Sequence, residues 1–437
     1  MRVSVIGCGY LGAVHAASMA HLGHEVVGVD VDVAKVEQLA GGEAPFYEPG
    51  LPELLASSLA TGRLRFTTDI AEAAGAQVHF VCVGTPQKKG EYAADLRYVD
   101  AAVQGLLPHL RPGDVVVGKS TVPVGTTERI AEEVTATQAG ATVVWNPEFL
   151  REGFAVQDTL HPDRIVYGLP DGEAGARARE LLDEVYATPI AEGIPVVVTD
   201  RATAQLVKVA ANSFLATKIS FINAMAELCE ATGADVTQLA DAIGYDARIG
   251  RRFLNAGLGF GGGCLPKDIR AFMARAGELG VDQALSFLRE VDSINMRRRV
   301  RTVDLVREVC DGSIVGRRVA VLGAAFKPDS DDIRDSPALS VAAQMGLQGA
   351  HVVVTDPQAL DNAERMWPDL RYAATADEAA KEADVVLLAT EWPEYRDLDP
   401  EVFGQVVARK VIVDGRNVLD PVAWRRAGWV YRALGRP

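Results

Sequence analysis

The sequence predicts an α/β protein in which two doubly wound, Rossmann-like parallel-sheet domains are joined by a long central helix and a helical middle region. Two observations predict the sheets: short apolar strands alternate with helical stretches in the first third of the chain, and the same alternation starts again near residue 318. A third observation predicts the connection, because residues 201–232 contain neither glycine nor proline. We therefore expect three regions, over residues 1–199, 200–312 and 313–437.

Length, charge and apolar runs exclude several classes of protein. A chain of 437 residues is too long for a single core, and no apolar run approaches the roughly 20 residues that span a bilayer. The formal net charge of −15 disfavours nucleic acids and anionic membranes as partners. The first residues run directly into a strand and a glycine turn, so we expect no signal peptide.

The cysteines indicate the redox environment. They are five in number, an odd count, and they are widely scattered without any Cys-x-x-Cys spacing. This usage argues against a structural zinc or other metal site and for a reducing, cytoplasmic environment. They are Cys8, Cys82, Cys229, Cys264 and Cys310.

The first strand, expected over residues 3–6, ends in a glycine-rich turn. Gly7, Gly9 and Gly12 follow it with the spacing Gly-x-Gly-x-x-Gly, and a helical stretch over residues 13–21 comes next. Gly7 allows the tight turn, Gly9 lets a pyrophosphate approach the helix N-terminus, and Gly12 lets helix and strand pack closely. The motif alone is weak evidence, because it can mark a mere tight turn.

The second strand supplies what the glycine motif lacks. Residues 25–29 form this strand, and Asp30 follows at its end. A carboxylate at this position accepts the ribose hydroxyls of a dinucleotide and repels a 2′-phosphate, which favours NAD over NADP. Strand, glycine turn, helix, strand and acidic residue in this order predict an NAD site.

Polar residues follow the later strands of this domain. We expect these strands over residues 78–83, 115–117 and 143–145, with helices between them such as 95–110 and 126–135. Ligands bind beyond the carboxyl ends of the strands in an open parallel sheet, so these polar residues should face the cofactor crevice. They are Thr85, Thr121, Glu148 and Glu152.

The individual roles of these strand-end residues differ. For Thr85 and Ser120, a turn or capping role is as good an interpretation as a functional one. Glu148 stands at a strand end between Pro147 and Phe149. A general base is the better interpretation there.

Asp200 is placed to cap the long helix over residues 201–232, which would be on the order of 45 Å long and could link two domains. Lys208 and Asn212 lie four residues apart on this helix and so share one face. One interpretation is a lysine that reaches solvent from an apolar face. The alternative is a cation and an amide presented together to a reacting oxygen, as an oxyanion site requires.

Five glycines, a cysteine and a Lys-Asp pair lie within residues 257–268. Such a segment forms neither a good helix nor a good strand, and it suits a loop that another molecule approaches closely. A nearby cation such as Lys267 favours the thiolate form of Cys264, and the carboxylate of Asp268 can move protons. A flexible surface loop with an unremarkable cysteine is the alternative.

The rest of the middle region is expected to be helical, over residues 235–243, 269–277 and 284–310. The last of these helices carries the arginine run 297–299. Because runs of like charge usually lie on solvated helix faces, we interpret this run as one.

The last third repeats the plan of the first domain, with strands expected over residues 318–322, 351–355, 384–389 and 410–413 and with Asp356 after the second strand. The glycine fingerprint is not repeated. We therefore expect this half-copy to bind something other than a dinucleotide. Cations at its strand ends could meet phosphates. They are Lys327, Arg334 and Arg416.

Taken together, these motifs resemble the UDP-glucose/GDP-mannose dehydrogenase family over nearly all of the chain. The resemblance is carried by many separate motifs in the right order. They are the N-terminal fingerprint, Tyr47-Glu48-Pro49-Gly50-Leu51, Lys119-Ser120-Thr121-Val122-Pro123, Asn146-Pro147-Glu148-Phe149-Leu150, the Lys208/Asn212 helix, the Cys264 loop, Ala325-Phe326-Lys327 and Asp414-Gly415-Arg416.

The resemblance implies an NAD-dependent, four-electron oxidation of UDP-glucose to UDP-glucuronate. Lys208, with Asp268 and an ordered water, would help to deprotonate the alcohol and stabilise the oxyanion. Cys264 would trap the aldehyde as a thiohemiacetal, and a second hydride transfer would give a thioester. Water activated by Glu148 would hydrolyse the thioester. Thr121 and Asn212 would position water and sugar.

The resemblance also implies the binding residues. The cofactor would contact Gly7, Gly9, Tyr10, Leu11, Gly12, Asp30, Lys35, Thr85, Thr121, Glu152 and Arg334. The substrate would contact Phe149, Leu150, Glu152, Lys208, Asn212, Arg248, Phe253, Leu254, Asn255, Gly261, Lys327 and Arg416. Arg248 would reach in from a neighbouring subunit, so we expect a homodimer or higher homo-oligomer. One departure is Gly263, where many relatives carry serine.

Three alternatives stay open at this point. The first is a sister enzyme that acts on GDP-mannose or a UDP-N-acetylhexosamine. The second is a two-electron dehydrogenase of the 3-hydroxyacid type, which shares the N-terminal domain and the long helix. The third is a catalytically inactive nucleotide-sugar sensor or scaffold, against which the set Lys208, Cys264 and Asp268 argues.

Overall fold

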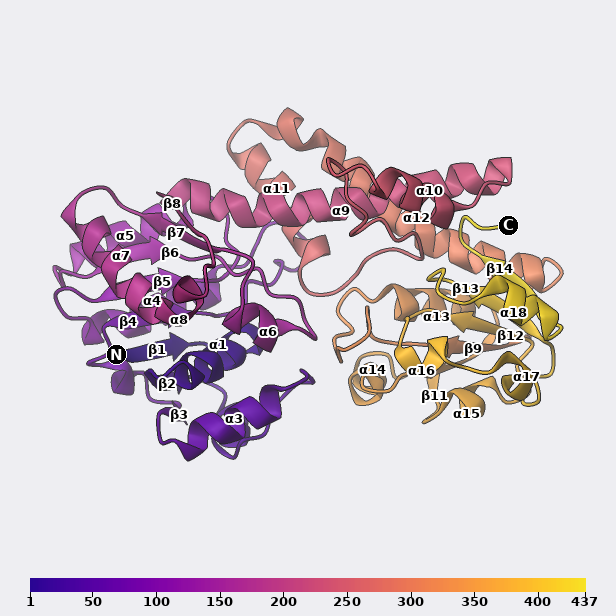
Figure 1. Ribbon diagram of the computed structural model, residues 1–437, viewed down its shortest axis with the longest axis horizontal. Helices are drawn as coiled ribbons and strands as arrows, with labels where there is room; N and C mark the ends of the chain where they lie inside the picture. Colours follow the sequence, from indigo (N-terminus) through magenta and orange to yellow (C-terminus); the bar gives the residue numbers. More distant parts are fainter. The chain divides into compact units, whose positions relative to one another are not determined.

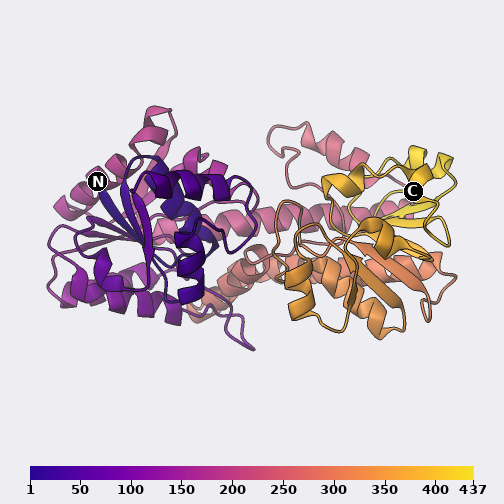
Figure 2. The ribbon, with the colours of Figure 1, turned by 90° about the horizontal axis from the view of Figure 1, so that it is seen from below.

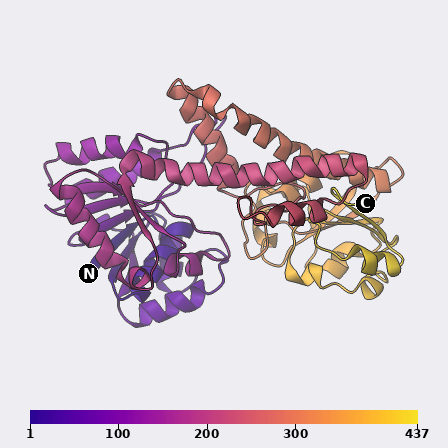
Figure 3. The ribbon, with the colours of Figure 1, turned by 45° about the horizontal axis from the view of Figure 1, so that its top comes forward.

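The computed structural model describes residues 1–437, and its contacts divide the chain into two compact units. The first unit comprises residues 1–211 and 274–280, and the second comprises residues 212–273 and 281–437. The boundary after residue 211 lies inside one 32-residue helix, α9 (Arg201–Thr232), which Figure 3 shows along its length. The expected division into three regions stays a prediction.

The first unit contains an eight-stranded sheet (Figure 1). Its first six strands in chain order are parallel and have the 3-2-1-4-5-6 arrangement of a doubly wound nucleotide-binding fold. The last two strands are parallel to each other, but the pairing that joins them to the rest is antiparallel. In spatial order the strands are β3 (Leu64–Thr67), β2 (Glu25–Val29), β1 (Arg2–Ile6), β4 (Val78–Val81), β5 (Val115–Gly118), β6 (Thr142–Trp145), β7 (Ile165–Leu169) and β8 (Val196–Asp200).

Five of these strands are predicted from the sequence, whereas β3, β7 and β8 are not. β3 and β8 form the two edges of the sheet, and most of their residues stay partly or fully exposed. β3 contains one buried apolar residue, whereas β7 and β8 contain short apolar runs, Ile165-Val166-Tyr167 and Val196-Val197-Val198. The unpredicted strands therefore include the interior strand β7 as well as the two edges.

Helices cover both faces of the first sheet, as the rotated view in Figure 2 shows. Successive strand residues point to opposite faces. Val115 and Val117 accordingly pack with α1, α3 and α7, whereas Val116 packs with α4 and α5. The helices of this unit are α1 (Tyr10–His21), α2 (Val33–Ala40), α3 (Leu51–Ala60), α4 (Arg97–Leu106), α5 (Thr126–Ala136), α6 (Ala155–Leu160), α7 (Glu173–Val185) and α8 (Ala187–Ala191), with 3₁₀ turns at Ile70–Ala73 and Leu107–His109.

The second unit contains a six-stranded sheet that is parallel throughout. In spatial order its strands are β11 (Arg371–Tyr372), β10 (His351–Thr355), β9 (Arg318–Leu322), β12 (Val385–Leu388), β13 (Val411–Asp414) and β14 (Val430–Ala433). This is again the 3-2-1-4-5-6 arrangement. The predicted fold class, two Rossmann-like sheets with a long helix and a helical middle region, is confirmed.

The helical part of the second unit packs around α9. Ala216 of α9 shares a small core with Ile269, Leu288 and Val291 of the following helices. No helix of the chain is both long enough and apolar enough to cross a bilayer. The helices are α10 (Val236–Gly244), α11 (Leu265–Glu278), α12 (Ser286–Val309), α13 (Pro337–Leu347), α14 (Leu360–Met366), α15 (Ala376–Ala380), α16 (Pro393–Arg396), α17 (Pro400–Phe403) and α18 (Pro421–Arg426), with a 3₁₀ turn at Asp282–Leu285.

Candidate active site

The glycine turn after β1 is shaped by steric need at two of its positions. Gly7 has a φ of +89°, a conformation that L side chains rarely adopt, and its N–H donates to the Val29 carbonyl at 2.7 Å. A Cβ at Gly12 would lie 1.8 Å from the Gly7 oxygen, so only glycine lets α1 start this close to the turn. A Cβ at Gly9 would meet nothing within 4 Å. The space beside Gly9, at the N-terminus of α1, is therefore open to a ligand phosphate.

Asp30 lies at the end of β2 beside this turn. Its carboxylate accepts hydrogen bonds from the backbone N–H of Cys8 at 2.8 Å and of Asp32 at 3.0 Å. The Lys35 ammonium lies 3.0 Å from the same carboxylate. These contacts fix the acid at the tip of the strand, where the fingerprint requires it.

Tyr10, in the first turn of α1, is tied to a distant motif. Its hydroxyl donates to the Glu48 carboxylate, which is buried. Glu48 also accepts the backbone N–H groups of Gly153 and Ala155, at 2.6 and 2.7 Å. Burial and the Glu48 hydrogen bond raise the pKa of Tyr10 above its ordinary value. Glu48 thereby joins the start of α1 to the turn that contains Glu152.

The predicted strand-end residues of the first unit form two contacts. The Thr85 hydroxyl donates to the Thr121 carbonyl at 2.8 Å. Glu148 and Lys208 form an ion pair with a Glu148 Oε1 to Lys208 Nζ distance of 2.9 Å. Both of these charged side chains are largely shielded from solvent. Because an ammonium carries no lone pair, Lys208 in this pair can donate hydrogen bonds to a developing oxyanion but cannot take a proton.

Three further contacts hold Glu148 and Phe149. The backbone N–H of Leu150 donates to Glu148 Oε2 at 2.6 Å. The Arg164 guanidinium lies 3.7 Å from the centre of the Phe149 ring, and the Lys208 ammonium lies 5.7 Å from it. The turn after β6 is thus fixed by its own backbone and by two cations.

In the second unit, Cys264 immediately precedes α11, and its carbonyl accepts the Asp268 N–H at 3.0 Å. Lys267 and Asp268 therefore lie in the first helical turn, whereas the sequence predicts a loop there. The Asp268 carboxylate is buried, accepts a hydrogen bond from the Asn212 amide at 2.6 Å and pairs with the Lys267 ammonium. The structure thus brings Asn212 and Asp268 together beside an exposed cysteine.

The glycine segment before Cys264 is held by α12. Asn295 accepts the Phe260 N–H at 2.7 Å and donates to the Phe260 carbonyl at 3.0 Å, so one buried amide binds both backbone groups of that residue. A Cβ at Gly259 would lie 2.6 Å from the Asn295 oxygen. Close approach of α12 therefore explains one of the five glycines in this segment.

The interpretation of the arginine run on α12 as a solvated helix face is wrong for two of its three members. Arg298 and Arg299 are 0% and 4% exposed. Arg298 donates to the Gly257 carbonyl and pairs with Glu230, whereas Arg299 pairs with Asp335 at 2.8 Å. Carboxylates and loop carbonyls compensate this burial, and a charge run alone does not reveal such partners.

The predicted substrate-binding residues near this segment differ in their exposure to solvent. Leu254 is buried in a small core with residues of α9 and α10. Phe253 is partly exposed and has a φ of +66°, a strained conformation that is concentrated at functional sites. Asn255 accepts a hydrogen bond from Arg251, and Arg248 is exposed and paired with Asp246.

The cations predicted at the strand ends of the second sheet have protein partners. Arg416 donates to the carbonyls of Ala389, Gly259 and Phe326, at 2.7, 3.1 and 3.2 Å. It thereby ties two strand ends to the glycine segment. The Lys327 ammonium lies 5.7 Å from the centre of the Phe326 ring.

Arg334 forms a bidentate pair with Asp332, and the same carboxylate accepts the Gly263 N–H at 3.2 Å. A Cβ at Gly263 would lie 2.2 Å from the Arg334 guanidinium carbon. Gly261 is packed equally closely, with a Cβ position 2.4 Å from the Asp335 carbonyl oxygen. The Arg334 guanidinium is the end of a long, exposed side chain and can move, whereas the Asp335 carbonyl belongs to the backbone, so the packing requires glycine at position 261.

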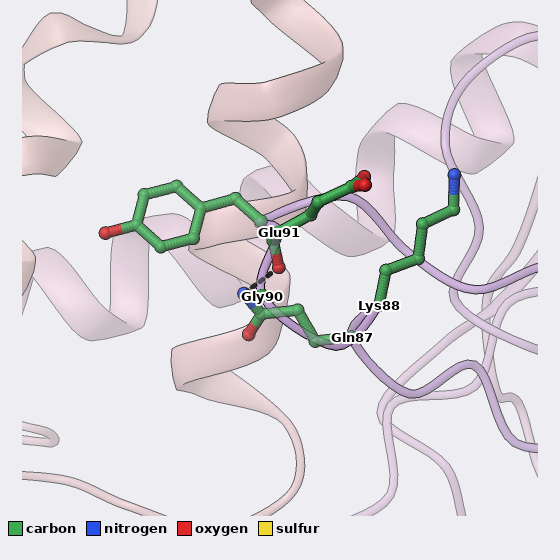
Figure 4. Close-up of a pocket in the computed structure, with 5 residues that line it drawn as sticks. Gln87, Lys88, Gly90 and Glu91 are labelled. Atoms are coloured by element: carbon green, nitrogen blue, oxygen red, sulfur yellow. Dashed lines mark hydrogen bonds between the residues drawn. The ribbon is translucent and has the colours of Figure 1, made fainter.

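A surface hollow in the first unit lies apart from these residues. Figure 4 shows it on the hairpin that follows β4, where the Gln87 amide donates to the Glu91 carbonyl at 2.6 Å. It is lined by Gln87, Lys88, Gly90, Glu91 and Tyr92. None of the predicted catalytic or binding residues lines this hollow, so it is not the candidate site.

Models of three domains of one family match the chain. They describe the NAD binding domain of the UDP-glucose/GDP-mannose dehydrogenase family over residues 1–189, its central domain over residues 202–297 and its UDP binding domain over residues 320–421. The chain belongs to this family. It is an NAD-dependent dehydrogenase, and its substrate class is the nucleotide sugars.

Similar proteins span the whole chain. The UDP-glucose 6-dehydrogenase of Rhizobium meliloti (strain 1021) is 44% identical over 100% of both chains. UDP-glucose 6-dehydrogenase TuaD of Bacillus subtilis (strain 168) is 40% identical over 100% of this chain and 93% of its own. A UDP-glucose dehydrogenase structure from Pyrobaculum islandicum is 41% identical, with a TM-score of 0.90 over 100% of this chain and 98% of that one. A UDP-D-ManNAc dehydrogenase structure from Pyrococcus horikoshii is 27% identical, with a TM-score of 0.87 over 100% and 99%.

The residues of the first unit fit the NAD cofactor of this dehydrogenase family. The open space at Gly9 and the N-terminus of α1 suit the pyrophosphate, and Asp30 suits the adenosine ribose. Contacts of the other predicted residues with cofactor and substrate stay predictions. Within the first unit Glu148 lies with Lys208, and within the second Asn212 lies with Asp268.

Several residues that hold the candidate catalytic groups in place are not predicted from the sequence to do so. Glu48 and Lys119 belong to motifs that the resemblance quotes without a role for either residue. Asn295 and Asp332 carry no sequence signal, because their contacts join segments that are far apart in the chain. For Arg299 the charge run predicts an exposed position, although this residue is buried.

Proposed function

We propose that the chain oxidises the primary alcohol of UDP-glucose to the carboxylate of UDP-glucuronate, with two NAD⁺ and one water consumed per sugar. The observation that carries this proposal is Cys264, an exposed cysteine at the start of α11 whose helix also presents the buried Asp268. A dehydrogenase that stops at an aldehyde does not need such a thiol. The identity of 40–44% to full-length UDP-glucose 6-dehydrogenases supports the choice of substrate.

Bound NAD⁺ would accept one hydride in each of the two oxidations. In the first, Asp268 receives the alcohol proton through a water molecule, and the Lys208 ammonium stabilises the alkoxide by donating hydrogen bonds to it. The Cys264 thiolate then adds to the aldehyde carbon, and the new carbon–sulfur bond gives a thiohemiacetal. Loss of the second hydride from this carbon leaves a thioester.

Hydrolysis completes the reaction. Glu148 takes a proton from a water molecule that attacks the thioester carbonyl, the carbon–sulfur bond breaks, and the Cys264 thiolate leaves. Thr121 and Asn212 position this water and the sugar. Because the carbon stays bound to sulfur between the two oxidations, the aldehyde is not released.

The experiment that tests this proposal is the stoichiometry of NADH per UDP-glucose. We expect two NADH for the unaltered enzyme, and for Cys264→Ser we expect turnover to stall at an aldehyde or covalent adduct. Cys229→Ser, at a buried cysteine, serves as the matched control. One NADH per sugar, or a Cys264→Ser variant that completes both oxidations, would reject the mechanism.

A sister substrate is the second candidate, because the chain also resembles a UDP-D-ManNAc dehydrogenase along its whole length. The lower identity of that protein, 27% against 41%, places it second. The same assay, run with GDP-mannose and with UDP-N-acetylhexosamines, separates the two. Strong turnover of one of these sugars without turnover of UDP-glucose would reverse the choice.

We also propose that the chain forms a homodimer through α9. Phe214, Phe221 and Leu228 recur every seven residues on this helix, and their side chains are 67%, 47% and 58% exposed. An apolar stripe at this spacing is typical of a helix that pairs with another. Light scattering of the unaltered chain should give a dimer, and Phe221→Asp should give a monomer. A monomeric unaltered chain would reject the dimer.

A further inference from the structure

Lys119 is a buried lysine of the first unit that the proposed mechanism does not use. It follows β5 directly and is 7% exposed. Its ammonium donates to the Asn146 amide oxygen at 2.9 Å and to the Tyr186 hydroxyl at 3.2 Å. Both of these partners are neutral. The Phe80 and Tyr186 rings lie 5.7 and 5.8 Å away and supply further weak compensation for the charge.

Asn146 connects this lysine to the catalytic turn. Its amide oxygen also accepts the Tyr186 hydroxyl at 2.6 Å, and its amide nitrogen donates to the Val166 carbonyl at 2.9 Å. The side chain is thus held from three directions at the end of β6. Pro147, with its fixed φ, follows directly, and Glu148 is the next residue. The position of the Glu148 carboxylate therefore depends on how firmly Asn146 is held.

The titratable groups around Lys119 come from four elements. Glu148 after β6 favours its charged form, and Lys208 on α9 opposes it. Cys82, which follows β4, also raises the pKa of Lys119. On α1, burial and the Lys119 ammonium lower the pKa of His15. Burial is the largest influence, and it lowers the pKa of Lys119 to about 8. A charge kept at this cost without a contacting carboxylate indicates a functional demand.

We infer that Lys119 is a positioning residue for Glu148: its ammonium holds Asn146, and thereby the turn that carries the carboxylate, and places a second positive charge behind that carboxylate. The inference rests on the proposed role of Glu148 in thioester hydrolysis. Lys119 thus acts in two ways, through its hydrogen bond to Asn146 and through its charge. Different variants can remove each of these.

The test uses the full-length enzyme and measures kcat and KM for NADH formation from about pH 5.5 to pH 9. Lys119→Met removes both hydrogen bond and charge in a similar shape. We expect kcat to fall about tenfold or more, the KM for NAD⁺ to stay within about twofold, and the acid limb of kcat to move up by about half a pH unit, because a nearby cation favours the ionised base.

Two matched variants separate the effect of the charge from that of the geometry. They also keep the inference testable if Lys119→Met does not fold. Lys119→Gln retains a donor for Asn146 without the charge, so the acid limb should move equally while kcat falls less. Tyr186→Phe retains the charge and removes one donor to Asn146, so kcat should fall by about threefold or less and the acid limb should stay in place. An unmoved acid limb in Lys119→Gln, or a moved one in Tyr186→Phe, would overturn the inference.

Glu148→Gln, measured in parallel, keeps this result apart from the proposed function. If Glu148→Gln turns over at the unaltered rate, the hydrolysis step is wrong, and the inference fails with it. If Glu148→Gln is impaired while Lys119→Met keeps the unaltered kcat and acid limb, the inference alone fails. Should the enzyme prefer another nucleotide sugar to UDP-glucose, the same variants are measured with that sugar.

Discussion

The two sheets share the strand order 3-2-1-4-5-6, but the segments that follow their first strands differ. In the first unit α1 begins four residues after β1 ends, whereas in the second unit α13 begins fifteen residues after β9 ends. The acid after the second strand differs as well. Asp30 accepts two backbone N–H groups and the Lys35 ammonium, whereas Asp356 accepts four backbone N–H groups and the Trp392 indole.

This difference teaches how one fold serves two ligands. The first sheet keeps a helix N-terminus and an acid at the crevice, which is what a dinucleotide needs. In the second sheet the Asp356 carboxylate already accepts hydrogen bonds from groups of the protein itself, and no helix begins directly after Gly323. The longer loop there instead reaches the segment before Cys264 through Asp332. A repeated topology therefore does not imply a repeated ligand.

We expect the largest effect from a substitution that disrupts the glycine turn after β1. In Gly12→Ala the new methyl would lie 1.8 Å from the Gly7 oxygen, so the backbone must shift. We expect a loss of about 2–4 kcal/mol in the free energy of unfolding and a loss of NADH binding of about 100-fold or more. Urea unfolding and a fluorescence titration with NADH measure the two. A variant that binds NADH normally would contradict the account.

Gly9→Ala is the matched control for that change. Its methyl would meet nothing within 4 Å and its φ is −69°, so stability should stay within about 0.5 kcal/mol. NADH binding should still weaken by about tenfold or more, because the methyl occupies the space for the pyrophosphate. In the second sheet Ala324 and Ala325 already carry methyl groups after Gly323.

Asp356→Asn and Asp30→Asn compare the two acids directly. An amide at position 356 would place its own N–H groups among five donors, so we expect a loss of about 2–4 kcal/mol in the free energy of unfolding with unchanged NADH affinity. Asp30→Asn should lose less than about 1 kcal/mol and weaken NADH binding by about tenfold. Similar effects of the two variants on NADH would show that the acids are not differently used.

Asn295→Ala tests the support of the cysteine segment in the second unit. The change removes both hydrogen bonds to Phe260, so we expect a loss of about 1–3 kcal/mol in the free energy of unfolding. Turnover should fall by about tenfold, since Cys264 lies four residues further on, whereas NADH affinity should not change. Ser293→Ala, at an exposed position of α12, is the control. Normal turnover in Asn295→Ala would show that the segment holds itself.

The last prediction concerns pH and the first unit. The pKa of Lys119 is about 8 in the folded chain and near 10.4 in an unfolded one. Between these values the unfolded chain binds more protons, so the contribution of Lys119 to the free energy of unfolding rises with pH by at most about 1.4 kcal/mol per unit. Urea unfolding at about pH 7 and pH 9.5 measures this, with Lys119→Met as the reference. A stability difference between the two proteins that does not change with pH would exclude the effect.

Most of the fold follows from the sequence, because buried parallel strands and a glycine-free helix give strong patterns. The two sheets and the long helix are examples, whereas the strands β3, β7, β8, β11 and β14 are not predicted. The reactive groups were also identifiable, since Cys264, Lys208 and Glu148 stand in motifs. What holds them was not, because Asn295, Asp332 and the buried Arg299 act through contacts between distant segments.

The exposure of the cysteines has a practical consequence. Four of the five thiols are buried, and the one that solvent can reach is the sulfur proposed to do the chemistry. Dilute alkylating reagents should therefore count active sites, because a single maleimide per chain would report the reactive sulfur without any engineered handle. The same accessibility makes peroxide damage selective: oxidation beyond the sulfenic acid at this sulfur would silence the enzyme while the remainder of the chain stayed intact.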